Sequence, residues 1–100
     1  MNPQAAAYWC SHEVLAGLGE PTMQSLVWHM AKAGVHMAPE NFDMRAFAAA
    51  LHDLLGGGAD VILDQVAKSM ARRLQVQVAE PGLPALERIT RIMEVAQKAQ

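Results

Sequence analysis

Three consecutive glycines, Gly56-Gly57-Gly58, constrain the fold of this chain more than any other feature. They separate two segments with apolar residues at helical spacing, 44–55 and 59–74. The first segment needs a residue at positive φ to end it, and glycine adopts that conformation without steric cost. Because the second segment begins almost at once, the two helices are expected to pack as an antiparallel hairpin. The sequence therefore predicts an all-α fold.

The composition agrees with this fold and limits the partners. The 100 residues predict one domain, long enough to bury a core without disulfides or a structural metal. Apolar residues make up 52%, with few aromatics, and this balance favours helix. The net charge of −2 provides no attraction to nucleic acid or anionic lipid. We therefore expect neither nucleic acid nor a membrane as a partner.

The single cysteine and the absence of targeting signals point to the cytoplasm. Cys10 alone cannot form an intrachain disulfide, so a reducing compartment is expected. Residues 1–9 lack the basic and long apolar regions of a signal peptide. The unbroken apolar run Ala46 to Leu51 is far shorter than the ~20 residues that span a bilayer.

The spacing of apolar residues and the helix signals predict five helices, at about residues 4–18, 21–33, 44–55, 59–74 and 84–98. Asp43 is a suitable N-cap for the third helix. Asp64 and Lys68, four residues apart on the fourth, are expected to pair. The alternating segment 75–78 is also read as a possible short strand, which would need a partner. The buried face of the third helix is expected to comprise Met44, Phe47, Ala48, Leu51, Leu54 and Leu55.

These elements predict a compact four-helix core with an additional C-terminal amphipathic helix. We assign residues 1–78 to the core, 79–84 to a Pro/Gly break and 85–100 to the last helix. The last helix is too short to be stable alone, so it must dock on its own core or on a partner chain. We favour the partner chain and predict a homodimer, because a large apolar surface is seldom exposed on a monomer. The coiled-coil-like seam consists of Leu86, Ile89, Met93 and Ala96, and Ile92 and Val95 widen it.

The middle of the chain resembles a known family. The motifs are Leu18-Gly19-Glu20, Val27-Trp28-His29-Met30, Phe47, Leu54-Leu55-Gly56, Gly58-Ala59-Asp60-Val61-Ile62 and Leu74. Over about residues 13–78 they are similar to the Nitrosopumilus-type output domain, fifth type, a small helical prokaryotic domain. The resemblance implies a module in prokaryotic signalling or regulation and brings no catalytic residues. It does not extend to the last helix.

No catalytic motif is present, so we expect a non-enzymatic module without a cofactor or metal. The four histidines, His12, His29, His36 and His52, form no His-x-x-x-His pair on one helical face. A metal site, or a nucleophilic Cys10, would need groups brought together from separate helices. The alternative interpretation is a small enzyme or a metal- or ligand-binding helical domain that uses Cys10 and these histidines.

Two further features bear on partners. Segment 66–89 faintly resembles a helix-turn-helix, but 80–84 is too long and proline-rich for the short turn of that motif. Trp9 and Trp28 are interpreted either as core residues or as anchors at an interface, where tryptophan is enriched. The predicted interaction residues, for a second copy or a protein partner of unknown identity, are Leu86, Ile89, Ile92, Met93, Ala96, Trp9 and Trp28.

Overall fold

The structure, a computed structural model, describes residues 2–77 and 82–98. These residues form α1 (Pro3–Ala16), α2 (Glu20–Lys32), α3 (Met44–Leu55), α4 (Gly58–Leu74) and α5 (Ala85–Lys98). They contain no strand, so the possible strand is not present in residues 75–77, and Val78 lies outside the described residues. The all-α prediction is confirmed. In the part of the chain that is described, no helix combines the length and apolar character needed to cross a membrane.

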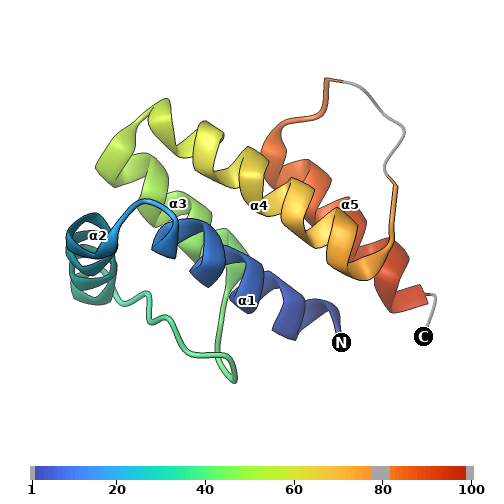
Figure 1. Ribbon diagram of the computed structural model, residues 1–100, viewed down its shortest axis with the longest axis horizontal. Helices are drawn as coiled ribbons and strands as arrows, with labels where there is room; N and C mark the ends of the chain where they lie inside the picture. The colour runs from blue at the N-terminus through green and yellow to red at the C-terminus, as the bar shows by residue number, and fades with distance from the viewer. Residues whose placement is uncertain (1, 78–81, 99–100) are drawn as a thin grey trace.

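α4 is the central helix of the molecule (Figure 1). It packs against α1, α3 and α5, while α2 packs on α3 and α1. α3 and α4 run antiparallel on either side of the glycine corner, and α5 runs in the same direction as α4. Every helix contributes to one buried cluster, whose largest fully buried apolar side chains are Leu15, Met30, Phe47, Leu51, Leu63, Val66, Met70 and Ile89.

Both ends of α3 follow from local chemistry. Gly56 ends the helix at φ 57° and ψ −131°, which confirms the positive φ predicted there. Gly57 has ordinary right-handed helical angles, and α4 begins at Gly58. At the other end, the carboxylate of Asp43 accepts hydrogen bonds from two backbone N–H groups of the first turn, at 3.0 and 3.1 Å. The predicted N-cap is therefore confirmed.

Two parts of the predicted pattern differ from the structure. α1 ends at Ala16 rather than Leu18, because the chain turns through Gly19, which has a φ of 98°, into α2. Leu54 and Leu55 were expected on the buried face of α3, but they are 38% and 39% exposed. They lie in the last turn of α3, at the end of the molecule, where the chain turns back into α4 (Figure 1). Less of the chain is available there to cover the apolar stripe.

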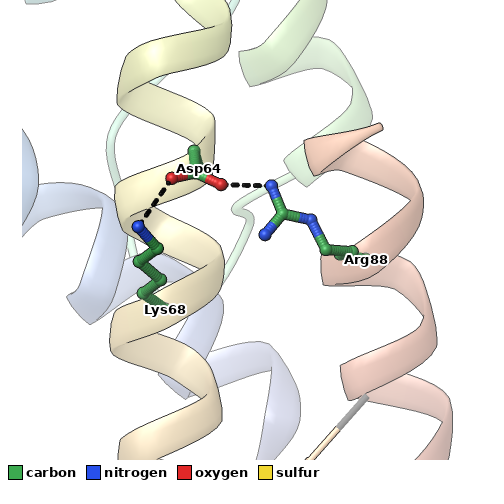
Figure 2. A network of polar contacts seen from close by, with 3 residues as sticks. All are labelled: Asp64, Lys68 and Arg88. Atoms are coloured by element: carbon green, nitrogen blue, oxygen red, sulfur yellow. Dashed lines mark hydrogen bonds and ion pairs between the residues drawn. The ribbon is translucent and has the colours of Figure 1, made fainter. Parts of the chain in front are cut away.

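α5 docks on its own chain. Ile89, Ile92 and Ala96 belong to the common core, and α5 packs mainly on α4 and to a smaller extent on α1. A charged contact supports this packing (Figure 2). The carboxylate of Asp64 on α4 accepts a hydrogen bond from the guanidinium of Arg88 on α5. The same carboxylate lies 3.1 Å from Nζ of Lys68, which confirms the predicted Asp64–Lys68 pair.

Candidate functional site

The predicted seam of α5 is mostly covered within the single chain. Ile89, Ile92 and Ala96 are buried, while Leu86 and Met93 are partly buried against the same core. Docking on its own core, the interpretation that we had not favoured, is thus the arrangement in the structure. Self-association stays a prediction, but these five residues can contact a second copy fully only if α5 leaves α4. An interface on the folded chain must use other side chains.

The two tryptophans are exposed. Trp28 on α2 is 55% exposed, and its ring is flanked by residues of the same helix. His29 lies edge-on to it at 4.9 Å between ring centroids, and Nζ of Lys32 lies 3.9 Å from the ring centroid. Trp9 on α1 is 45% exposed and makes an edge contact with Tyr8. Neither tryptophan is a core residue, so both keep their interpretation as interface anchors.

A second group of exposed apolar side chains lies at the ends of the helices. Leu54 and Leu55 close α3, Val61 is in the first turn and a half of α4, and Leu18 follows α1. Val61 is 61% exposed and Leu18 is 41% exposed. Figure 1 shows the α1–α2 connection and the α3–α4 corner at the same end of the molecule. We call these four residues, Leu18, Leu54, Leu55 and Val61, the corner patch.

A polar contact joins the two helices across the glycine corner next to this patch. Nε2 of His52 in the last turn of α3 lies 3.2 Å from the carboxylate of Asp60 in the first turn of α4. Asp60 also has a favourable position for a carboxylate at the helix N-terminus. Both side chains are exposed, so the pair contributes little to stability. Its geometry is that of a structural link between two helices.

Cys10 and the histidines do not form a metal-binding group in the described residues. The Cys10 side chain is fully buried in the core, where burial raises the pKa of its thiol and a hydrogen bond with Ser69 acts in the opposite direction. A buried thiol with a raised pKa is a poor nucleophile at neutral pH. Within residues 2–77 and 82–98, no group of three or more His, Cys, Asp or Glu side chains could hold a metal ion. The alternative chemistry therefore gains no support from the arrangement of these residues.

An open groove of about 900 Å³ lies in the described surface. Its apolar floor comes from Pro3 at the start of α1, Phe42 and Met44 around the start of α3, and Met93 on α5. The amide of Gln4 donates a hydrogen bond to the carbonyl oxygen of Phe42, which ties two of these elements together. Charges of both signs line the rim: Glu40, Asp43, Glu94, Arg45 and Lys98.

Two arginines, one on α4 and one on α5, form ion pairs within the fold. Arg73 on α4 lies 2.6 Å from the carboxylate of Glu13 on α1, and Arg88 pairs with Asp64. These contacts connect α4 to the helices on either side of it. The charges of Arg73 and Arg88 are therefore balanced by nearby carboxylates, which weakens any attraction of these arginines to phosphate groups.

Comparisons with known proteins do not place the chain in a family. No family model, no curated protein and no solved structure matches it.

Sequence analysis did not identify the corner patch or the groove as candidate sites. The patch had a signal in the sequence, because the apolar stripe of α3 continues to the residue before Gly56. The interpretation of the sequence places that whole stripe in the core, which would require another helix to cover the last turn of α3. The groove had no such signal, since its lining comes from three segments far apart in the sequence.

Proposed function

We propose that this chain is a non-enzymatic helical interaction module that self-associates through its corner patch. The observation that supports the proposal is the exposure of four large aliphatic side chains on helix ends and turns that Figure 1 shows at one end of the fold. Scattered exposed apolar residues are ordinary, whereas a contiguous apolar patch is typical of an interaction site, and we propose that these four side chains form one. A second copy is the simplest partner, because an apolar surface is complementary to itself and most soluble oligomers are symmetric homo-oligomers.

The proposal includes the biological setting inferred from the sequence. The similarity of residues 13–78 to the Nitrosopumilus-type output domain supports a role in prokaryotic signalling or regulation. The lone buried Cys10 is compatible with a reducing cytoplasm. We further propose that α1–α4 act as the core unit and that α5 is an added helix that completes it. An additional protein partner would use the same corner patch or the exposed Trp9 and Trp28.

Self-association is tested by light scattering and sedimentation velocity over a range of concentrations. We expect the unmodified chain to form a dimer and Val61→Glu to weaken that dimer about tenfold or more, because two carboxylates would meet in an apolar contact, and about 1.4 kcal/mol corresponds to tenfold. Val61 is suitable because its exposed side chain can be replaced without disturbing the core. Glutamate near a helix N-terminus is also favourable for the fold.

Val95→Glu is the matched control. Val95 is an exposed valine on α5, away from the corner patch, and the change adds the same charge. Equal weakening by both variants would indicate either a general charge effect or an interface that includes the exposed face of α5, and both results would contradict the assignment to the corner patch. A chain that stays monomeric at the highest concentrations tested would overturn self-association altogether.

A further inference from the structure

We draw no further inference here: the strongest candidate, the open groove between the start of α1, residues 40–45 and the second half of α5, has charges of both signs on its rim, and nothing in the structure shows what covers it.

Discussion

Gly56 ends α3 in a region of φ and ψ that side-chain-bearing residues rarely adopt. A Cβ built at this position meets no other atom within 4 Å, so space does not limit the substitution. The requirement for glycine is therefore one of backbone conformation alone. The neighbouring Gly57 is in a right-handed helical conformation, with open space around it as well. Two adjacent glycines thus have different conformational demands.

We predict that Gly56→Val lowers the free energy of unfolding by about 1–3 kcal/mol, the cost of a strained backbone position. Gly57→Ala is the control, and it should be neutral or stabilising by up to about 1 kcal/mol, because alanine adopts the native angles and restricts the unfolded chain. Chemical denaturation of both variants measures the difference. Equal midpoints for Gly56→Val and the unmodified chain would contradict the structural role of Gly56.

Asp64 is the residue whose protonation bears most directly on the docking of α5. Hydrogen bonds from Arg88, and then from Lys68, hold the pKa of Asp64 below its ordinary value. A carboxylate with a lower pKa in the folded state stabilises the fold at neutral pH. This stabilisation is fully present above the pKa of the unfolded chain, about 3.9, and it is lost as the pH falls through the folded pKa.

We predict that Asp64→Asn lowers the free energy of unfolding at pH 7 by up to about 1 kcal/mol, the scale of a partly exposed pair. The difference from the unmodified chain should shrink as the pH falls below about 4. Denaturant titrations across the acid range measure it. Asp53→Asn, at an exposed position on α3, controls for loss of a negative charge. A deficit for Asp64→Asn that is independent of pH would argue against the ion pair as its cause.

At the scale of the elements, α5 is part of the same core as the other helices. Its apolar face packs on α4, and the contact between Arg88 and Asp64 joins the first halves of the two helices. The periodicity of α5 correctly identified the side that is buried, since Ile89, Ile92 and Ala96 all lie in the core. Periodicity does not identify the surface that covers this side of α5, and the interpretation of the sequence assigns that covering surface to a second chain.

Truncation after Gly82 tests whether α5 completes the core of its own chain or joins two chains. We expect the truncated chain to lose its cooperative unfolding transition, because removing α5 exposes the apolar face of α4 and deletes fully buried side chains such as Ile89. Circular dichroism during thermal unfolding provides the measurement. A milder form is Ile89→Ala, which should cost about 2–5 kcal/mol.

The opposite result for the truncation is equally informative. A truncated chain that stays folded, while the full chain is dimeric and the truncated one monomeric, would identify α5 as the oligomerisation element. Val95→Ala provides a control for substitutions on α5. Val95 is exposed, and a substitution at an exposed position outside the core changes the free energy of unfolding by no more than about 0.5 kcal/mol.

At the scale of the whole molecule, binding to nucleic acid depends more on the overall balance of charge than on any local cluster of basic residues. The net charge is −2, and two arginines of α4 and α5 are bonded to carboxylates of neighbouring elements. Binding to duplex DNA depends largely on cations that are available to phosphates. Arg73 and Arg88 instead connect neighbouring helices within the fold.

We therefore predict weak or no binding to duplex DNA at near-physiological salt. Fluorescence anisotropy with labelled duplexes of different sequence measures this directly. A sequence-selective complex with nanomolar affinity, as specific DNA-binding proteins form, would overturn the prediction. It would direct attention to Arg72, Arg73, Arg88 and Arg91 on α4 and α5.

The sequence by itself determined the features that depend on neighbouring residues along the chain. The helices, the cap at Asp43, the positive φ of Gly56 and the Asp64–Lys68 pair all follow from spacings of four residues or fewer or from the conformational freedom of one residue. Helix boundaries were less well defined, as the end of α1 shows. Local signals agree with one another here, so the fold class could be derived without the structure.

Only the tertiary structure decided which apolar surfaces are covered. Leu54 and Leu55 continue the same stripe as Leu51, yet Leu51 is buried and the other two are exposed at the end of the molecule. The seam of α5 is covered by α4 rather than left for a partner. Burial depends on helices distant in sequence, and hydrophobic periodicity specifies a face without specifying its cover. For this reason the corner patch, on which the proposed function rests, became visible only in three dimensions.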